Sequence, residues 1–485
     1  MNYEDIMKLA LERGFYFPSC EVYADAQAGF WEYGPCGVSL KNKFLELWRR
    51  ELIRRDGMME IDGSQIMSKS VFEASGHLGN FADPIIKCTK CKSTFRADRT
   101  ISEISKIEIP ESADLEEFDK AILQNNIKCP KCKGDFENTK KFNMMFKVGI
   151  GPEEEPAYLR PETCQSIFVD FPRLFKTMRG KLPLGIAQVG KSFRNEISPR
   201  QSLLRLREFY QAEIEVFCNP TKLDEMEKFS EIADTIIRIQ VDSKLQVITC
   251  KEAVESKIIP NKFVAYYLAI LIEFYEKTGI DVTKSRFRKL GDKEKAFYAQ
   301  VAFDFEVETT IGWLELVACN YRSDYDLSSH AKKSKEKFEV MDNHEKVLPH
   351  VFEISMGIDR SLYTILEHSL YEDKENERTV LSLKPYLAPI HIGVLSLIKK
   401  DGLKEKADEI YLQIKRKYDV FLDHSGAIGR RYRRLDEIGA PFAITVDHQS
   451  LEDQTVTLRK RDSMEQNRIK ISEIDSILSE FIAYP

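Results

Sequence analysis

Residues 190–217, GKSFRNEISPRQSLLRLREFYQAEIEVF, combine fixed charges of both signs with the alternation of an antiparallel hairpin. Side chains of a strand point alternately to its two faces. The residues at 210, 212, 214 and 216 therefore share an apolar face, and the acidic Glu213 and Glu215 lie on the other. Two interpretations are open. One is a solvated sheet face with cross-strand ion pairs, and the other is a site for a ligand with phosphate, ammonium and an aromatic ring.

Four of the ten cysteines form two close pairs, KCTKC (Cys88, Cys91) and KCPKC (Cys129, Cys132). Two such pairs can supply four thiolates to one tetrahedral zinc ion. The segment between them is charged and too poor in apolar residues to form a core by itself, so a structural zinc would stabilise it. Surface thiols or disulfides are the alternatives. Because four protein ligands leave no open position, a zinc ion here would be structural rather than catalytic.

The whole chain has the composition of an ordinary globular protein, with 485 residues, 43% hydrophobic and 31% charged. Its length favours two or three domains. The formal net charge of −6 argues against bulk electrostatic binding to nucleic acid but is compatible with a local basic patch. The N-terminus lacks the apolar core of a secretory signal, and no apolar run is long enough to span a membrane. With mostly scattered cysteines, these features lead us to expect a cytoplasmic protein without membrane insertion.

Residues 1 to about 370 are expected to form one α+β body. Strand-like alternation at 301–309 (VAFDFEVET) resumes at 312–322 and 351–355. Antiparallel strands with intervening helices favour an α+β sheet over a parallel one.

Two insertions are expected to interrupt this body. The first, about 84–140, carries the paired cysteines. The second, about 220–295, has helical periodicity at 223–240 and again at 262–277.

The pattern of predicted helices and strands changes in the C-terminal part of the chain. Residues 371–385 begin with a charged, weakly apolar run and are expected to be a linker. Over 386–485, strands alternate with helices, which predicts a small α/β domain with a mostly parallel sheet. Four arginines within 430–434 lie on one predicted helix. They are interpreted either as a solvated helix face or as a nucleic-acid contact.

Several stretches resemble known signature motifs. FRNE with the loop and REFYQAEIEVF resembles motif 2 of class II aminoacyl-tRNA synthetases, and FEISMGIDRSLYTILEH resembles motif 3. LRPETCQSIFVDF, GWLELVACNYRSDYDLSSH and GAPFAITVDHQSLEDQTVTLRKRDSMEQNRI are similar to glycyl-tRNA synthetases of the dimeric archaeal and eukaryotic type, as is GFYFPSCEVYADAQAGFWEYGPCGVSLKNKF. The likeness runs from about residue 13 to the C-terminus and is weakest in the insertions. It implies an α+β class II catalytic domain with an antiparallel sheet, a zinc-binding insertion and a C-terminal α/β anticodon-binding domain.

The resemblance implies ATP-dependent attachment of glycine to tRNA(Gly) through glycyl-adenylate, with release of pyrophosphate and AMP. The glycine carboxylate would attack the α-phosphate of ATP, so the protein would align two anionic reactants and neutralise developing charge. Arg194 would hold the α-phosphate, and Arg360 would cover the adenine and approach the γ-phosphate. These two arginines are the expected catalytic residues, because a guanidinium is planar, always charged and binds pairs of oxygens.

Further residues are implied for the ATP site. Phe209 would stack on adenine and Glu196 would meet the adenine amino group. Arg205 would hold the distal phosphates, and Glu315 would help bind Mg²⁺ with ATP. The expected ATP site is Arg194, Asn195, Glu196, Arg205, Leu206, Phe209, Glu315, Leu316 and Arg360.

A glycine site is implied as well, made of Glu162, Glu213, Arg322, Glu353 and Ser355. The three glutamates would surround the amino group, with Ser355 beside them and Arg322 near the carboxylate. Clustered glutamates repel one another unless a cation joins them, which fits a site completed by its ligand. Alanine would be excluded for lack of space, and because glycine has no smaller competitor, no editing domain is expected.

Two other residues, Arg96 and Glu215, are further candidates for the site. Arg96 lies in FRADR, where the family has a histidine in place of Arg99, so the resemblance is incomplete there.

The resemblance also implies partners. GFWEYGPCGVSLKNKF resembles motif 1, which in this class forms the interface of a homodimer. The C-terminal domain would bind the anticodon region of tRNA(Gly), with the 430–434 helix and 459–461 near the anticodon stem. Two alternatives remain open: a synthetase for another amino acid, such as threonine, proline or histidine, and a synthetase-like accessory protein that binds nucleic acid without catalysis.

Overall fold

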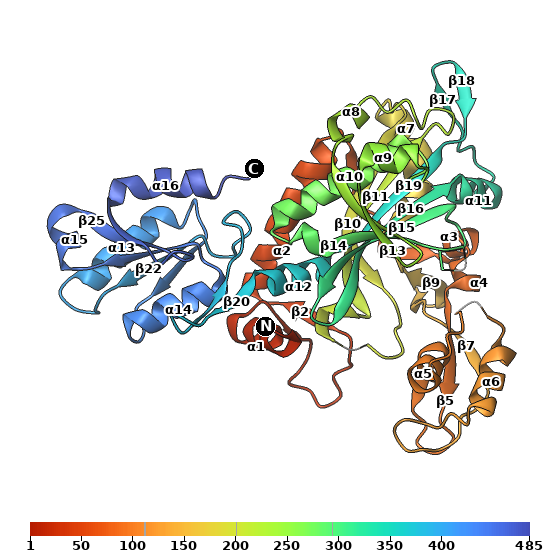
Figure 1. The fold of residues 1–485 in the computed structure, drawn as a ribbon, viewed down its shortest axis with the longest axis horizontal. Coiled ribbons are helices and arrows are strands. Elements are labelled where there is room, and N and C mark those ends of the chain that lie inside the picture. Colours follow the sequence, from red (N-terminus) through yellow and green to blue (C-terminus); the bar gives the residue numbers. More distant parts are fainter. Residues whose placement is uncertain (111–112, 200, 293) are drawn as a thin grey trace.

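The computed structural model describes residues 1–110, 113–199, 201–292 and 294–485. Within them, the larger body is built on a nine-stranded sheet (Figure 1). The strand order is β13-β12-β14-β15-β16-β19-β11-β10-β3. Neighbours are antiparallel except β3 with β10 and β12 with β14. The strands are β3 (Met59–Ile61), β10 (Leu184–Phe193), β11 (Glu208–Cys218), β12 (Ile236–Val241), β13 (Lys244–Thr249), β14 (Ser285–Lys289), β15 (Val301–Thr309), β16 (Gly312–Ser323) and β19 (His350–Gly357). The predicted antiparallel α+β body is confirmed.

The two faces of this sheet are covered differently. On one face, the main core joins Ile214, Val216 and Phe305 to helices α1 (Tyr3–Arg13), α2 (Pro35–Trp48), α10 (Lys262–Thr278) and α12 (Ile358–Ser369). On the other, α7 (Cys164–Thr177) and α11 (Tyr325–Ser334) pack over the end of β10 and β11 that carries Ile186 and Phe217. The remainder of that second face carries the charged residues of the motif-like strands.

The cysteine-bearing insertion forms a small separate unit (orange in Figure 1). Its elements are β5 (Ala82–Lys87), β6 (Thr94–Arg96), α5 (Ala97–Ser105), α6 (Leu115–Gln124) and β7 (Lys140–Asn143). The expectation that it lacks a core of its own was wrong, because Ile86, Ile101, Phe118 and Ile127 pack together. These few apolar side chains are spread thinly along the sequence, and two short helices bring them onto one side.

The second insertion belongs to the body rather than standing apart from it. The helix expected at 262–277 is α10, but the helix expected at 223–240 is wrong, since this segment forms turns, the short α8 (Phe229–Ile232) and strand β12. The β-branched run Ile236–Ile237 favours a strand, and β12, β13 and β14 extend the central sheet at one edge. Helix α9 (Cys250–Glu255) follows β13.

The predicted linker, residues 371–385, lies in a segment (370–389) that packs against both domains. Strands β20 (Leu370–Asp373) and β21 (Arg378–Leu381) form a hairpin. Leu383 and Leu387 join the main core, and the Arg378 guanidinium binds the carboxylates of Asp373 and Asp436. The segment therefore fastens the C-terminal domain to the body.

The C-terminal domain is a small α/β unit (blue in Figure 1). Its sheet order is β23-β22-β24-β25-β26, with β22, β23 and β24 parallel and β25 and β26 antiparallel. The elements are β22 (Ile392–Ser396), α13 (Leu403–Ile414), β23 (Val420–Asp423), α14 (Ile428–Ile438), β24 (Phe442–Val446), α15 (His448–Asp453), β25 (Thr455–Lys460), β26 (Gln466–Lys470) and α16 (Ile474–Phe481). The predicted α/β domain is confirmed.

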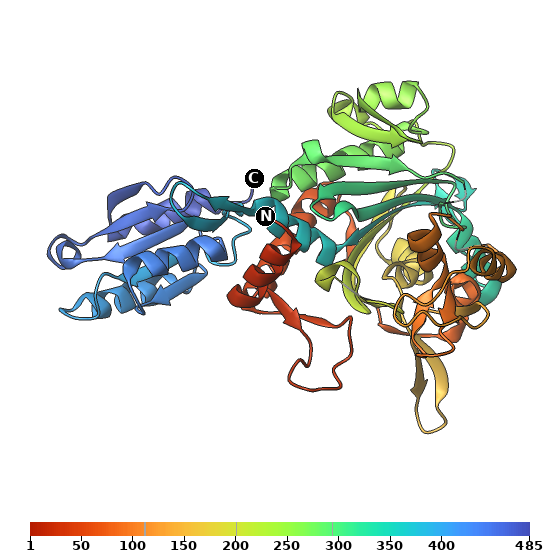
Figure 2. The same ribbon diagram turned by 60° about the horizontal axis from the view of Figure 1, so that its bottom comes forward.

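The other elements are short. Figure 2 shows the loop between β1 and β2 (red) extending away from the body, and its residues 20–28 are exposed. The elements are β1 (Tyr16–Pro18), β2 (Trp31–Tyr33), the π-helical turn Arg49–Arg54, β4 (Ile66–Ser68), α3 (Lys69–Ala74), α4 (His77–Asn80), β8 (Lys147–Ile150), β9 (Glu155–Leu159), the 3₁₀ turns Ser202–Leu204, Val282–Lys284 and Ile471–Glu473, β17 (Val340–Asp342) and β18 (Glu345–Val347). No helix in the described part of the chain has the length and hydrophobicity needed to cross a membrane.

Candidate active site

A cavity opens on the charged face of the sheet, between β11, β16, β19 and the first turn of α12. It brings together residues far apart in the chain, as the antiparallel pairing β16-β19-β11-β10 requires. Its lining is Glu162, Arg194, Glu196, Leu203, Leu204, Arg205, Leu206, Phe209, Tyr210, Gln211, Glu213, Tyr298, Glu315, Leu316, Ala318, Asn320, Glu353, Ser355, Gly357, Asp359 and Arg360. The charged hairpin is therefore the wall of a cavity rather than a flat solvated face.

Two arginines stand at one end of the cavity with donors still available for a ligand. The Arg194 Nε donates to the carbonyl oxygen of Pro161 (3.2 Å), and its guanidinium lies 5.2 Å from the centroid of the Phe209 ring. The Arg360 Nε and Nη1 donate to the carbonyl oxygens of Leu204 (3.2 Å) and Glu315 (3.0 Å). A guanidinium has five N–H groups, so both side chains are held in place while keeping free donors.

The neighbouring Arg205 and Glu196 bind each other, with Arg205 Nε donating to Glu196 Oε2 over 2.7 Å. Leu206 and Leu316 line the same end. Asn195 is not among the described lining residues, and its backbone N–H donates to the carbonyl oxygen of Met144. The strand pairing therefore brings the predicted ATP residues together, except for the Asn195 side chain.

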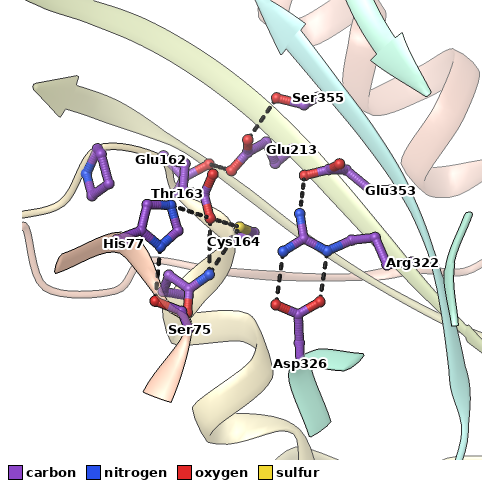
Figure 3. A network of polar contacts seen from close by, with 12 residues as sticks. Ser75, His77, Glu162, Thr163, Cys164, Glu213, Arg322, Asp326, Glu353 and Ser355 are labelled. Carbon is purple, nitrogen blue, oxygen red and sulfur yellow. Dashed lines mark hydrogen bonds and ion pairs between the residues drawn. The ribbon is translucent and has the colours of Figure 1, made fainter. Parts of the chain in front are cut away.

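Glu213 lies at the centre of the other end of the cavity. Its carboxylate accepts hydrogen bonds from the hydroxyls of Thr163 and Ser355, both at 2.6 Å (Figure 3). Gln211 Nε2 also donates to it over 3.2 Å. Burial, together with the nearby charge of Glu162, raises the pKa of Glu213 above its usual range, since both disfavour the ionised form. A cation bound in the cavity would offset this cost.

Glu353 lies on the neighbouring strand and is held by two donors. Arg322 Nη1 donates to Oε1 over 2.8 Å, and Asn320 Nδ2 donates to Oε2 over 2.6 Å. Burial and the acidic neighbours Glu213 and Glu162 raise the pKa of Glu353 to about 7, against the opposing effect of Arg322. The carboxyl is thus positioned firmly but ionises readily only beside positive charge.

Glu162 completes the acidic wall from the turn before α7. Its Oε1 accepts from Gln165 Nε2 (2.8 Å) and Cys164 Sγ (3.0 Å), and His77 Nε2 lies 3.4 Å away (Figure 3). Burial opposes ionisation of Glu162, but His77 and Arg322 outweigh it and hold the pKa of that carboxyl well below its usual range. Glu162 is therefore an anion in the wall of the cavity.

Arg322 lies differently from the expectation that it approaches a bound carboxylate. Its side chain is 1% exposed and is not among the described residues that line the cavity. Nε and Nη2 fork onto the two oxygens of Asp326 at 2.6 and 2.7 Å (Figure 3). The guanidinium also stacks on Tyr298, 3.7 Å from the centroid of its ring. With Nη1 on Glu353, it orients that carboxyl from behind rather than facing the cavity.

The two further candidates, Arg96 and Glu215, also lie outside the described cavity lining. Arg96 is buried and binds Asp83 (2.9 Å) and Asp98 (2.7 Å) within the insertion. Nearby, partial burial and the guanidinium of Arg205 lower the pKa of Arg99, which places α5 close to the loop between β10 and β11. Glu215 is fully buried behind Glu353.

Some cavity residues were not predicted from the sequence. Gln211, Asn320 and Tyr298 line the cavity, and Asp359 accepts hydrogen bonds from the Tyr33 hydroxyl (2.5 Å) and the Tyr210 backbone N–H (2.6 Å). The alternation that singled out Glu213 also points Gln211 to the same face, so that residue could have been found. The link to Tyr33 depends on tertiary packing and left no local signal.

The four paired cysteines meet at one point of the insertion. Sγ of Cys88 lies 3.5 Å from Sγ of Cys132, and Sγ of Cys91 lies 3.7 Å from Sγ of Cys129. All four sulfur atoms lie within 4.8 Å of one another. Tetrahedral zinc with bonds of about 2.3 Å separates its sulfurs by roughly 3.8 Å, so this arrangement fits a zinc ion.

The arginines of the C-terminal domain are mostly engaged inside it. Arg431 donates to the carbonyl oxygens of Ser396 and Asp423, Arg459 binds both oxygens of Asp436, and Arg461 donates to Gly439. These three are buried, so the expected place of Arg431, Arg459 and Arg461 beside the anticodon stem is not supported. Arg430 and Arg433 are exposed on α14.

Comparison with known proteins assigns both domains to a class. Residues 146–369 match the tRNA synthetase class II core domain (G, H, P, S and T), and residues 386–481 match the anticodon binding domain. Among solved structures, a prolyl-tRNA synthetase of Giardia lamblia in complex with prolyl-adenylate has a TM-score of 0.61 at 15% identity, covering 99% of this chain and 79% of that one. The RNA binding domain of a threonyl-tRNA synthetase of Cryptosporidium parvum gives 0.60 at 18% identity, covering 99% and 98%. The fold and cavity thus define a class II aminoacyl-tRNA synthetase.

Curated relatives show which family within this class the chain matches. Glycine–tRNA ligase of Methanocaldococcus jannaschii is 40% identical, covering 99% of this chain and 98% of the relative. The same ligase of Pyrococcus furiosus is 38% identical, covering 99% of each. The chain belongs to the glycine–tRNA ligases.

Proposed function

We propose that this chain joins glycine to tRNA(Gly) in two steps within the cavity. In the first, a glycine carboxylate oxygen attacks the α-phosphorus of ATP, and the bond to pyrophosphate breaks to leave glycyl-adenylate. In the second, the terminal hydroxyl of the tRNA attacks the adenylate carbonyl and AMP leaves. The observation that carries the proposal is that Glu213, Glu353 and Ser355 line the same cavity as Arg194 and Arg360. This arrangement offers anionic groups to an ammonium and guanidinium groups to phosphates.

The nucleotide end is proposed to work by positioning and charge neutralisation. Arg194 binds the α-phosphate and Phe209 stacks on adenine, with Arg360 on the other face of the base and near the γ-phosphate. Arg205 must release Glu196 to reach the distal phosphates, which also frees Glu196 for the adenine amino group. Mg²⁺ bound with ATP would neutralise phosphate charge, and Glu315, whose carboxylate is 45% exposed at the cavity, is the proposed ligand from the protein.

The glycine end is proposed to bind the ammonium with the carboxylates of Glu162, Glu213 and Glu353, and Ser355 beside them. A bound ammonium explains how three buried acids can be charged together. Arg322 is proposed to position Glu353 rather than to bind the substrate carboxylate. Alanine is excluded because a methyl group has no room among these side chains; overpacking costs about 1–3 kcal/mol.

The C-terminal domain is proposed to bind the anticodon region of tRNA(Gly). The exposed Arg430 and Arg433 are the proposed phosphate contacts, because Arg431 is buried. We also propose a homodimer that uses the motif 1-like segment 29–44, which forms β2 and α2, together with the edge strand β3. A cytoplasmic location fits this function.

The domain boundaries are proposed as 1–370 for the catalytic domain, with insertions at about 84–140 and 220–295, and 386–485 for the anticodon-binding domain. Cys88, Cys91, Cys129 and Cys132 are proposed to hold a structural zinc ion. Zinc removal by a chelator, or Cys91→Ser, should make residues 82–143 sensitive to protease while the body stays folded. Unchanged protease resistance in a zinc-free protein would contradict the zinc proposal.

The direct test of the function is pyrophosphate–ATP exchange by the purified protein with each amino acid in turn, without tRNA. Glycine alone should support exchange, and Glu213→Gln should abolish it. Exchange with another amino acid would keep the class and overturn the glycine pocket. The absence of exchange from a folded, zinc-loaded protein would favour the alternative of a non-catalytic accessory protein.

A further inference from the structure

Glu215 is a buried acid without a hydrogen-bond partner in the described part of the chain, although charged residues lie close to it. Its side chain is 0% exposed. Neither carboxyl oxygen has a hydrogen-bond partner among the described residues. It does not line the described cavity, so no ligand in the cavity reaches it directly. An ionised carboxylate that is buried without a partner carries a high desolvation cost, so burial favours the protonated form of Glu215.

The strand register places Glu215 directly opposite Glu353 on β19 and opposite Ile186 on β10. Directly opposed side chains of antiparallel strands have Cβ atoms about 5 Å apart, and like charges there are destabilising. Glu353 is already bound by Arg322 and Asn320. The guanidinium of Arg322 in turn has its remaining arms on Asp326. The guanidinium that lies beside Glu353 is therefore committed to two other acids.

The charged and titratable groups around Glu215 come from every neighbouring element. Those that act on it directly are Glu213 on β11, Glu353 on β19, Arg322 on β16, Asp326 on α11 and Cys164 on α7. Glu162, which accepts from Cys164, and its neighbour His77 lie beyond them, as does His330, which contacts Gln165. Acids dominate this set. Burial, followed by the charge of Glu353, raises the pKa of Glu215 well above its usual range.

We propose that Glu215 is a positioning residue that stays protonated beside Glu353, so that the pair carries a single negative charge and Glu353 is held for the ammonium of glycine. The proposal rests on the proposed glycine site. A protonated carboxyl has one O–H donor, and the acceptor facing it across the strands is Glu353. With this proton the two carboxyls no longer repel each other, and the O–H of Glu215 becomes a donor for a lone pair of Glu353 that Arg322 and Asn320 leave unused. Glu215 touches no substrate and acts through its neighbour.

The decisive variant is Glu215→Gln, which keeps the shape of a neutral carboxyl. Its KM for glycine in pyrophosphate exchange at pH 7 should stay within about threefold of the wild type, because the amide replaces a neutral group of the same size. Glu215→Leu, which has no donor, should raise the KM for glycine about tenfold with a smaller change in kcat, since Glu353 loses its partner. A KM for the Gln variant raised as much as that of the Leu variant would overturn the proposal, as would a Leu variant indistinguishable from the wild type.

A second readout does not depend on activity. If Glu215 is protonated in the folded protein, its contribution to stability is full below about pH 4 and is lost as pH rises toward its folded-state pKa. The urea midpoint of Glu215→Gln should therefore rise relative to the wild type between pH 5 and pH 8. The exposed Glu155→Gln, as matched control, should show no such change. A midpoint difference that does not change between pH 5 and pH 8 would mean that Glu215 is ionised throughout and would contradict the proposal, whether or not the glycine assignment holds.

Discussion

Arg194 and Arg360 in the cavity differ from Arg459 and Arg461 in the C-terminal domain in what their guanidinium groups bind. The cavity arginines are partly exposed and are anchored mainly by backbone carbonyl oxygens. The carboxylate contact of Arg360 is with the exposed Glu315, at 3.4 Å, and not with a buried acid. Arg459, in contrast, is buried and forks onto both oxygens of Asp436 at 2.7 and 2.9 Å. An arginine anchored through carbonyls keeps its charge for a ligand, whereas one paired with a buried carboxylate has its charge neutralised within the fold.

Arg322 shows that a position near the active site does not by itself make a guanidinium available to a ligand. It lies behind the glycine end, yet it is buried and bound to Asp326 and Glu353. By the same criterion it belongs with the structural arginines. The partner of each guanidinium therefore separates ligand-binding arginines from structural ones, and the following variants test this division.

The largest effect is expected for Arg360→Ala. The loss of a guanidinium that stabilises phosphate charge should lower glycine-dependent pyrophosphate exchange by about 10³-fold and leave the thermal midpoint nearly unchanged. Arg433→Ala, which removes an exposed arginine of α14, is the control and should not alter exchange. An Arg360→Ala variant that retained more than about a tenth of the wild-type activity would show that Arg360 does not stabilise the phosphate charge.

Arg459→Ala should act on stability instead. It leaves the buried Asp436 without a bidentate partner, which should cost about 3 kcal/mol in the free energy of unfolding, measured by urea denaturation. Exchange per folded molecule should be unchanged, because the C-terminal domain does not take part in the first step. Arg459→Lys should rescue only part of the stability, since an ammonium does not match the two oxygens. If Arg459→Ala lost exchange activity but kept its stability, Arg459 would have a functional rather than a structural role.

A smaller effect is expected on tRNA. The double variant Arg430→Ala with Arg433→Ala should raise the KM for tRNA(Gly) in aminoacylation about tenfold and weaken its salt dependence, because two phosphate contacts are lost. Pyrophosphate exchange without tRNA is the internal control. A KM for tRNA that does not change would show that another face of the domain binds the anticodon region.

The smallest effect concerns Asp359, the buried neighbour of Arg360. Burial raises its pKa to about 6, although its hydrogen bonds from Tyr33 and Tyr210 act in the opposite direction. Because the folded-state pKa lies above the unfolded value, this contribution to stability is full below about pH 4 and is lost as pH rises through 6. Relative to Asp359→Asn, the wild type should lose about 1 kcal/mol between pH 5 and pH 8. A difference independent of pH would show that Asp359 is ionised throughout.

The sequence predicted the sheet and the cavity better than the surroundings. Alternation identified both faces of β11, since burial of Ile214 and Val216 forces Glu213 to the opposite side. It could not tell β12 from a helix, because Ile236 and Ile237 satisfy either pattern until strand β13 pairs with them. It also could not distinguish Arg360 from Arg322, because the difference lies in Asp326 and Glu353, which only the fold brings to the same guanidinium.

The most direct test is calorimetric titration with a non-hydrolysable methylene analogue of ATP, which carries the γ-phosphate that Arg360 is proposed to approach. Wild-type protein and Arg459→Ala should bind it with equal affinity, and Arg360→Ala should bind it about tenfold more weakly, because a charge-assisted contact between guanidinium and phosphate is lost. Equal weakening by both arginine variants, or failure of the wild type to bind, would contradict the division between ligand-binding and structural arginines.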